Sequence, residues 1–242
     1  MLEASAIICA VRNHGEHGGI VRAITRDHGL VTGYVSGARS RALRPVLIPG
    51  NSVAGVWKAR GGDQLASLSL ELAHSRAALM DEPLAAAAID WLTSVTAATL
   101  PPEHPYPPLF LALEGVLGAI EAAPTAKGWA ATIVRFELLL LAQLGFGLDL
   151  ESCTVTGQTH DLAWVSPRSA RAISREAATG YETKLLSLPA FMIDQSRATW
   201  PDVLAGLRLT GHFLATALLT GRATSVMAAR ERLVDRLVSA AD

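Results

Sequence analysis

Positively charged side chains cluster in a stretch of the chain that lacks acids. No Asp or Glu occurs between Asp27 and Asp63. Guanidinium and ammonium groups bind the phosphates of nucleic acids, and a local basic face can do so on a protein whose net charge is only -1. A solvated surface of strands and loops is the alternative interpretation. The residues predicted to contact phosphates are Arg22, Arg26, Arg39, Arg41, Arg44, Lys58 and Arg60.

The stretch LGFGLDLESCTVTG, residues 144–157, carries one cysteine, Cys153. In a zinc knuckle of the C-x-x-C type the second thiolate would stand at position 156, which is Thr156 here. A structural zinc site needs four nitrogen or sulfur ligands, and His160 is the nearby further candidate. Two ligands cannot complete a tetrahedral site, so we expect no metal and a Cys153 that is a small buried apolar residue. The expected packing anchors of the segment are Trp164, Ile173 and Tyr181.

Sequence motifs of enzyme chemistry are missing. His14, Glu16 and His17 stand together in HGEHGG, but their spacing matches no zinc-protease motif, and the glycines indicate a hairpin turn. The sequence has no nucleophile elbow, no P-loop and no dinucleotide-binding loop after a strand. Its carboxylates are scattered singly rather than paired to hold two metals. We therefore expect a protein that is not an enzyme and needs no cofactor.

The composition is typical of a folded intracellular protein. The chain has 242 residues, of which 50% are hydrophobic and 18% charged, enough for one large domain or two modest ones. Its 2 cysteines give no disulfide framework and are compatible with a reducing cytoplasm. We expect neither a signal peptide nor a membrane span, which needs about 18 consecutive apolar residues.

The first eighty residues are rich in short runs of Val, Ile, Leu and Thr separated by glycine-bearing turns, a pattern that predicts strands. Five strands match the count of an OB-type barrel. The connection at 39–51 contains Pro45 and Pro49 and is predicted to be a basic loop on the rim of the barrel. Tyr34 and Trp57 could stack on bases or belong to the core. The expected strands are residues 5–15, 19–29, 30–38, 52–60 and 64–73.

After residue 80 the pattern becomes helical, with an irregular insert at about 150–190. Gly145 is a plausible helix C-cap, and Thr199 with Asp202 has the spacing of a capping box. The chain is thus predicted to be an α+β multidomain protein, with an OB-fold domain at 1–80 and a helical domain at 81–242. The expected helices are residues 83–100, 105–122, 127–145, 199–221 and 225–240.

Several short motifs, taken in order, resemble those of the bacterial recombination mediator family RecO over nearly the whole chain. The N-terminal ones are Thr25-Arg26-Asp27-His28-Gly29, Gly37-Ala38-Arg39 and Pro49-Gly50. The most specific segment is Arg135-Phe136-Glu137-Leu138, followed by Leu144-Gly145-Phe146 and by Asp149-Leu150 before Cys153. Near the C-terminus, Ala229-Arg230-Glu231 with Leu233 is similar to a further family helix. No single motif is decisive, but their order and spacing together are fairly specific.

The resemblance implies an OB barrel and a helical domain that often carries a four-cysteine zinc knuckle. This chain departs from the knuckle pattern at Thr156, Ser174 and Ala177, which suggests a member without the metal. The resemblance also implies a non-enzymatic, cytoplasmic and nucleoid-associated protein that binds single- and double-stranded DNA and anneals complementary strands. Its implied protein partners are RecR, the C-terminal tail of the single-strand-binding protein SSB and, indirectly, RecA.

The family holds the acidic, Phe-ended tail of SSB on its helical domain, for which Arg135 and Arg230 are the candidate cations. An internal ion pair is the alternative for Arg135. Two other functions stay open from the residues alone: an OB-fold RNA or tRNA binder, and a structural adaptor whose basic face docks an acidic protein.

Overall fold

The computed structural model describes residues 1–59, 61, 65–123, 125–194 and 196–240. The chain divides into two compact units. The first comprises Met1–Ala122 with Ala228–Leu233, and the second comprises Ala123–Met227 with Val234–Asp242. No helix of the described residues is long and apolar enough to cross a membrane.

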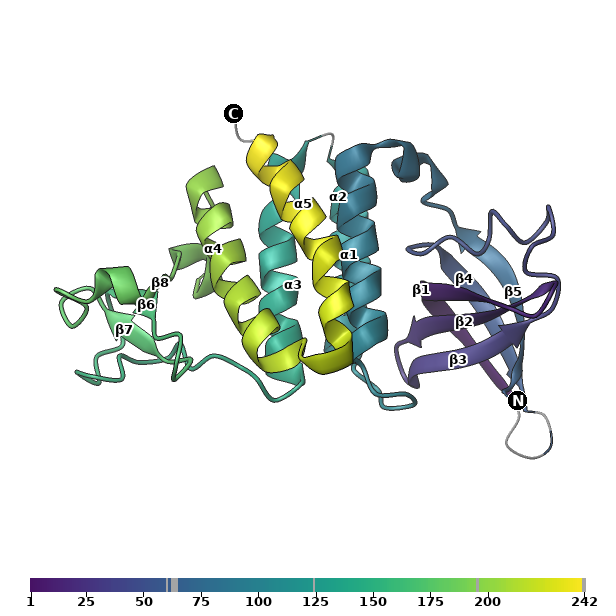
Figure 1. The fold of residues 1–242 in the computed structure, drawn as a ribbon, viewed down its shortest axis with the longest axis horizontal. Helices are drawn as coiled ribbons and strands as arrows, with labels where there is room; N and C mark the ends of the chain where they lie inside the picture. Colours follow the sequence, from purple (N-terminus) through teal and green to yellow (C-terminus); the bar gives the residue numbers. More distant parts are fainter. Residues whose placement is uncertain (60, 62–64, 124, 195, 241–242) are drawn as a thin grey trace. The chain divides into compact units, whose positions relative to one another are not determined.

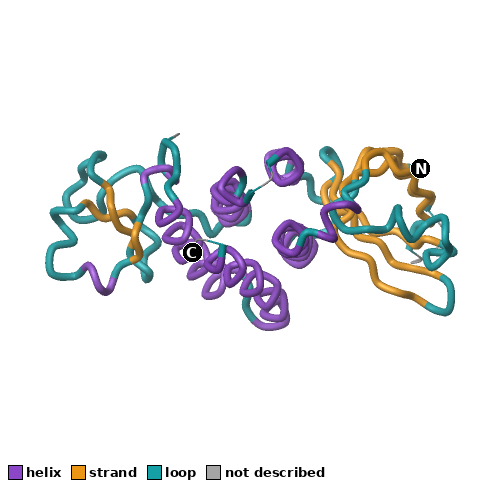
Figure 2. The backbone as a smooth tube through the Cα atoms, turned by 90° about the horizontal axis from the view of Figure 1, so that it is seen from above, coloured by secondary structure: helices purple, strands orange, loops and turns teal. Residues whose placement is uncertain are grey.

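The first unit begins with a closed five-stranded barrel (Figure 1). Its strands follow the order β1-β2-β3-β5-β4, in which β4 pairs antiparallel with β1 and β3 pairs parallel with β5. Figure 2, in which strands are orange, shows them curving around a common interior. The prediction of an N-terminal OB-type barrel is confirmed. The strands are β1 (Leu2–His14), β2 (Gly18–Thr25), β3 (Gly29–Val35), β4 (Ser52–Lys58) and β5 (Ser67–His74).

The barrel interior contains small and branched apolar side chains and one indole. Trp57 is only 3% exposed, so the core interpretation holds for this residue. Two glycines make room for it: a Cβ on Gly55 would lie 2.5 Å from the six-membered ring of the indole, and a Cβ on Gly33 would lie 3.0 Å from its Cδ1. The other buried residues of this core are Ala6, Ile8, Val21, Ala23, Val31, Val35, Ala38, Leu47, Val53 and Leu68.

Helix α1 (Pro83–Thr99) lies against β1 and belongs to the same unit. Pro83 occupies its first turn, where a missing N–H costs nothing. A Cβ on Gly50 would lie 2.7 Å from Cγ2 of Ile89, so the chain before β4 approaches the helix closely. A short 3₁₀ turn (Ala77–Asp81) precedes α1, and α2 (Pro107–Ala122) follows it.

The link between α1 and α2 is attached to the start of β3. Pro102 forms a parallel bridge with Leu30, and the N–H of Glu103 donates to the carbonyl of Leu30 at 3.2 Å. Gly29, with φ of 65°, lies so close to His104 that an added Cβ would be 1.9 Å from its carbonyl oxygen. Only glycine fits this position.

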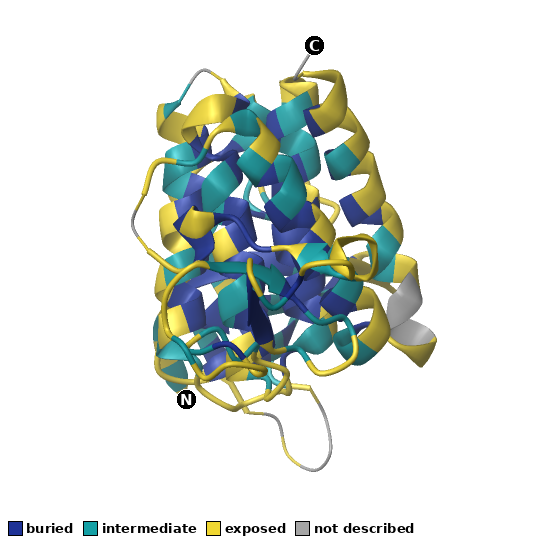
Figure 3. Ribbon diagram, turned by 90° about the vertical axis from the view of Figure 1, so that its left-hand side faces the viewer, coloured by how far each residue is buried: buried dark blue, intermediate teal, exposed yellow. Residues whose placement is uncertain are grey.

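The second unit contains helices α3 (Ala130–Gln143) and α4 (Trp200–Phe213), which contact each other. The C-cap of α3 is Leu144, one residue before the predicted Gly145. Gly145 follows it with φ of 86°, and its N–H donates to the carbonyl of Ala142, so the helix ends where the glycine predicted. The capping box of Thr199 and Asp202 is also confirmed, because both of its hydrogen bonds are present. The helices carry buried residues on one side and exposed residues on the other (Figure 3). Helix α5 (Met227–Ser239) has residues in both units.

Two parts of the second unit differ in kind from the expected structure. The helix expected to run to residue 221 is α-helical only to Phe213 and continues as a π turn (Leu214–Leu218) and a 3₁₀ segment (Gly221–Val226). The insert is not wholly irregular, since it holds a small sheet of order β7-β6-β8. Its strands are too short to leave a periodic pattern: β6 (Leu162–Val165), β7 (Ala172–Ser174) and β8 (Leu186–Ser187).

Candidate nucleic-acid interface

The connection between β3 and β4 is a fixed element, here called the basic loop (residues 37–50). Successive turns build it: Ser40 N–H donates to Gly37 at 2.8 Å, and Arg44 N–H donates to Ser40 at 3.0 Å. The hydroxyl of Ser40 also accepts the N–H of Leu43 at 3.2 Å. Backbone groups that bond within the loop restrict its conformations, so the backbone positions of its side chains are defined.

The basic loop has an apolar side and a charged side. Ala38 and Leu47 are buried in the barrel core, and Leu43 and Val46 pack against it. The three arginines of the loop are exposed. Burial of the apolar residues removes them from water and leaves the guanidinium groups in solvent. The loop therefore presents Arg39, Arg41 and Arg44 together on the surface of the first unit.

A fully buried asparagine anchors this loop. The amide nitrogen of Asn51 donates to the carbonyls of Pro45 at 2.9 Å and Val46 at 3.2 Å. Its amide oxygen accepts the backbone N–H of Arg76 at 2.8 Å, and Nη1 of Arg76 donates to the carbonyl of Gly50 at 2.6 Å. Sequence reasoning missed both residues. The position of Asn51 between a Pro-Gly turn and a strand was the one available signal.

Arg76 is a structural cation rather than an exposed one. Its side chain is 6% exposed, and its Nε lies 3.6 Å from a carboxylate oxygen of Glu121 in α2. Burial lowers the pKa of Arg76 below its ordinary value, while the charges of Glu121 and Glu114 oppose that shift. Arg76 holds the basic loop through its bond to the carbonyl of Gly50. Because Glu121 compensates its charge inside the unit, Arg76 adds nothing to the positive charge of the surface.

A hollow of about 420 Å³ lies between β1 and the basic loop. Arg39 and Arg44 line it together with Val11, Asn13 and Leu47. Two guanidinium groups beside an amide give donors for the oxygens of a phosphate, and the apolar residues can contact a sugar or base.

The remaining predicted phosphate contacts are placed differently. Arg26, beyond the end of β2, and Lys58, at the end of β4, are exposed. Arg22 is half-buried, and its Nη1 donates to the carbonyl of Ala97 in α1, so this guanidinium joins the barrel to the helix. Arg60 lies outside the described residues.

The two candidate cations for a peptide tail have different surroundings. Arg135 on α3 is exposed, with its guanidinium carbon 5.6 Å from the ring centroid of Phe191 and Nη2 3.4 Å from the carbonyl of that residue. Arg230 is 6% exposed and lies over the ring of Trp91 at 5.9 Å. The first is available to an incoming carboxylate, whereas the second is mainly enclosed by its own unit.

The knuckle-like segment forms two facing turns. Gly157 N–H donates to the carbonyl of Cys153, and Ala178 N–H donates to that of Ser174. The backbone N–H of Ser174 also donates to the Cys153 sulfur at 3.3 Å. Burial raises the pKa of Cys153, but hydrogen bonds involving Ser174 and Thr156 outweigh it and lower the pKa to about 6.

The residues of these turns do not fit zinc. Of the four knuckle positions, only Cys153 supplies a thiolate, whereas a structural zinc site needs four nitrogen or sulfur ligands. Cys153 is 1% exposed and packs with Ile173, as expected, and Trp164 is partly buried against them. The expectation that Tyr181 anchors the insert is wrong, because its side chain is 60% exposed. The described residues contain no group of three or more His, Cys, Asp or Glu that could hold a metal ion.

A closed five-stranded barrel with a basic loop, followed by a helical domain, defines a protein of the OB-barrel class. Residues 1–76 match the family model described as "Recombination protein O N terminal", and residues 80–225 match "Recombination protein O C terminal". The chain therefore belongs to the RecO family of DNA repair proteins.

Individual relatives agree with this assignment. The chain is 44% identical to the DNA repair protein RecO of Phenylobacterium zucineum over 240 residues, which cover 98% of each chain. It is 44% identical to that of Rhodospirillum centenum over 96% of this chain and 92% of the relative. It is 42% identical to that of Gluconacetobacter diazotrophicus, over 97% and 94%.

Proposed function

We propose that this protein is a DNA-binding recombination mediator that contacts the phosphates of single- and double-stranded DNA through its basic loop. The observation that carries the proposal is the exposure of Arg39, Arg41 and Arg44 on one loop that Asn51 holds in place. Arg26, Lys58 and Arg60 extend the phosphate contacts in this proposal. Arg22 is retained as a lesser contact, since it already bonds the carbonyl of Ala97.

In this proposal the protein is not an enzyme but anneals complementary strands. A surface that neutralises phosphates lowers the repulsion between two strands, and contacts to the backbone leave the base edges free to pair. Together with RecR it would help to load RecA on DNA coated by SSB. The division into a DNA-binding domain at 1–80 and a helical domain at 81–242, and a cytoplasmic, nucleoid-associated location, belong to the same proposal.

Strand annealing tests this function. Two complementary oligonucleotides, one with a fluorophore and one with a quencher, are mixed with the wild type or with a variant carrying Arg39→Ala, Arg41→Ala and Arg44→Ala. The matched control carries Arg168→Ala, Arg197→Ala and Arg208→Ala, three exposed arginines of the second unit. Both variants lose the same charge. We expect the wild type and the control to anneal the strands and the loop variant to lose most of its activity. Equal activity of the two variants would contradict the proposal.

The proposed site for the SSB tail is the exposed guanidinium of Arg135, which lies over the ring of Phe191. Arg230 belongs to the first unit and is 6% exposed, so it is proposed only as a separate and weaker candidate. An exposed guanidinium suits the terminal carboxylate of the tail peptide, and the buried ring of Phe191 supports the guanidinium from below. Binding of a labelled acidic, Phe-ended peptide should fall several-fold in Arg135→Ala and stay unchanged in Arg208→Ala. Unchanged binding in both would move the tail site elsewhere.

RNA binding and protein docking are the competing functions. Competition with a single-stranded RNA of the same length as the DNA distinguishes RNA binding from DNA binding. An RNA binder would release the DNA at a lower concentration of RNA than of unlabelled DNA. An adaptor would bind an acidic protein at about 100 mM salt while failing to bind DNA there.

A further inference from the structure

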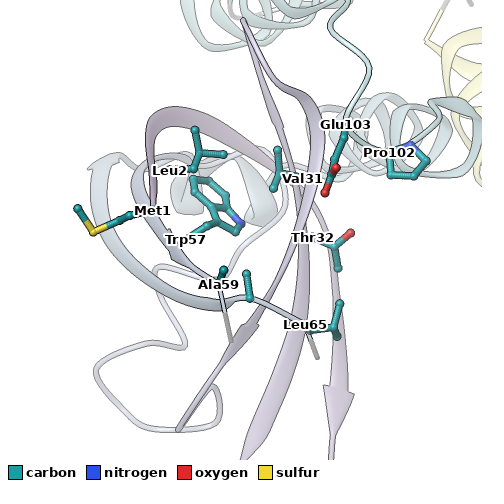
Figure 4. A pocket seen from close by; sticks show the side chains of 10 residues that line it. Met1, Leu2, Val31, Thr32, Trp57, Ala59, Leu65, Pro102 and Glu103 are labelled. Atoms are coloured by element: carbon teal, nitrogen blue, oxygen red, sulfur yellow. The ribbon is translucent and has the colours of Figure 1, made fainter. Parts of the chain in front are cut away.

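A second pocket lies on the barrel, and it shares no lining residue with the hollow of the basic loop. It has a volume of about 590 Å³, within the range of about 300–1,000 Å³ in which small ligands are bound. Most of its wall is apolar and includes Leu2, Val31 and Leu65. Figure 4 shows these side chains around Trp57.

The pocket contains a buried hydrogen-bond donor without a partner. Trp57 is 97% buried, since its relative exposure is 3%, and its Nε1 has no hydrogen-bond acceptor among the described residues. In Figure 4 this nitrogen faces the side on which Val31 and Thr32 lie. An indole nitrogen only donates, and a buried donor left unpaired is costly, so an acceptor is missing at this place.

The sequence fixes the orientation of this donor. The indole lies over Gly55 and beside Gly33, and a Cβ at either position would come within about 3 Å of it. The indole therefore cannot turn its nitrogen away without losing this packing. The packing of the barrel core thus determines where the indole nitrogen lies.

The polar groups of the pocket include a carboxylate and a hydroxyl. They belong to Glu103 and Thr32. Glu103 has φ of 56°, a strained conformation for a residue other than glycine, which the hydrogen bond to Leu30 maintains. A neutral ligand with both an acceptor and a donor fits these groups.

We propose that this pocket receives one unstacked base of single-stranded DNA. Every base is a neutral, flat group whose edge carries both acceptors and donors. A base acceptor would bond Nε1 of Trp57, a base N–H would bond the Glu103 carboxylate, and the apolar wall would contact the ring. Because Nε1 of Trp57 is itself buried, lining side chains such as Leu65, which is 43% exposed, must shift for an acceptor to reach it. This inference rests on the proposed function, because it presupposes that the protein binds single strands.

The test compares strands with and without bases. Affinities are measured for oligo-dT and for an abasic oligonucleotide of the same length, at several salt concentrations. The variants are Trp57→Phe, which removes the donor but keeps an aromatic ring, and Leu65→Trp, which enlarges an exposed side chain that lines the pocket. Circular dichroism and thermal unfolding confirm that each variant folds. An oligonucleotide with one 4-thiothymine adds a photocrosslink, whose position is found by mass spectrometry.

The expected loss of oligo-dT affinity in Trp57→Phe is about 2- to 10-fold, the size of one net hydrogen bond. Leu65→Trp should lower it similarly, and abasic binding and the salt slope should not change, because the phosphate contacts remain. The crosslink should fall on lining residues of the pocket, within 31–32, 57–59, 65–66 or 102–103. If wild type binds oligo-dT but neither variant changes that binding, the pocket serves another ligand, such as an apolar peptide side chain, and the inference is overturned. If wild type binds neither strand, the proposed function itself fails.

Discussion

The amide oxygen of Asn51 accepts the backbone N–H of Arg76 at 2.8 Å, although the two residues are 25 positions apart. This bond joins the start of β4 to the chain that leaves β5. The amide nitrogen of the same asparagine bonds two carbonyls of the basic loop. One buried side chain thus connects the barrel with the surface proposed to bind DNA.

Asn51→Ala should lower both stability and DNA affinity. It removes three hydrogen bonds and leaves the buried N–H of Arg76 unpaired, which costs about 1–3 kcal/mol. The basic loop then loses its anchor, so the backbone that carries its arginines is no longer held in place. Denaturant unfolding measures the first effect and oligonucleotide binding the second. The exposed Asn13→Ala should change the free energy of unfolding by less than about 0.5 kcal/mol. Similar stabilities of the two variants would show that Asn51 is no anchor.

Gly29→Ala should destabilise the protein more than Gly37→Ala. Both glycines have positive φ, 65° and 66°, so both substitutions incur the left-handed cost of about 1–2 kcal/mol. Only at Gly29 does the new Cβ meet an atom, the carbonyl oxygen of His104 at 1.9 Å, whereas nothing lies within 4 Å at Gly37. Thermal unfolding of the pair measures the difference. Equal losses would mean that the contact between the start of β3 and the α1–α2 link does not matter.

Gly206→Ala and Gly115→Ala should change stability in opposite directions. Both glycines are helical, and replacing a helical glycine by alanine stabilises by about 0.5–1 kcal/mol where there is room. Gly115 has nothing within 4 Å, but a Cβ on Gly206 would lie 2.8 Å from Cγ1 of Val134 and 3.2 Å from Phe191. Overpacking there should cost about 1–3 kcal/mol. A stabilised Gly206→Ala variant would contradict the close packing of α3 and α4.

The stability contributed by Cys153 should depend on pH. Its pKa is about 6 in the folded chain against an ordinary value of 9.0, so between these values the unfolded state binds more protons than the folded one. The contribution is complete above pH 9 and is lost as the pH falls through about 6. Denaturant unfolding at several pH values, compared with Cys153→Ala, should therefore show a wild-type advantage that grows with pH. Parallel curves would mean that the thiolate is not stabilised.

The sequence predicts those parts of the fold that local chemistry decides. The glycine-separated strands and the capping box of Thr199 and Asp202 depend on neighbouring residues, and the structure confirms them. Contacts between segments that are distant in the sequence cannot be predicted from neighbouring residues. The bond of Arg22 to Ala97 joins residues 75 positions apart, and the role of Asn51 depends on atoms from three segments. In the insert, strands of two to four residues carry no period, so the exposure of Tyr181 was not predictable.

The most direct test of the central claim is the fluorescence anisotropy of labelled oligo-dT across salt concentrations. It compares the wild type, the variant lacking Arg39, Arg41 and Arg44, and the variant lacking Arg168, Arg197 and Arg208. If the basic loop binds phosphates, the loop variant should lose affinity, and its log-log salt slope should be smaller by about 2, since each lost contact removes about 0.7. The control should keep the slope of the wild type. A loop variant with the same affinity and slope as the wild type would show that the basic loop is only a solvated surface.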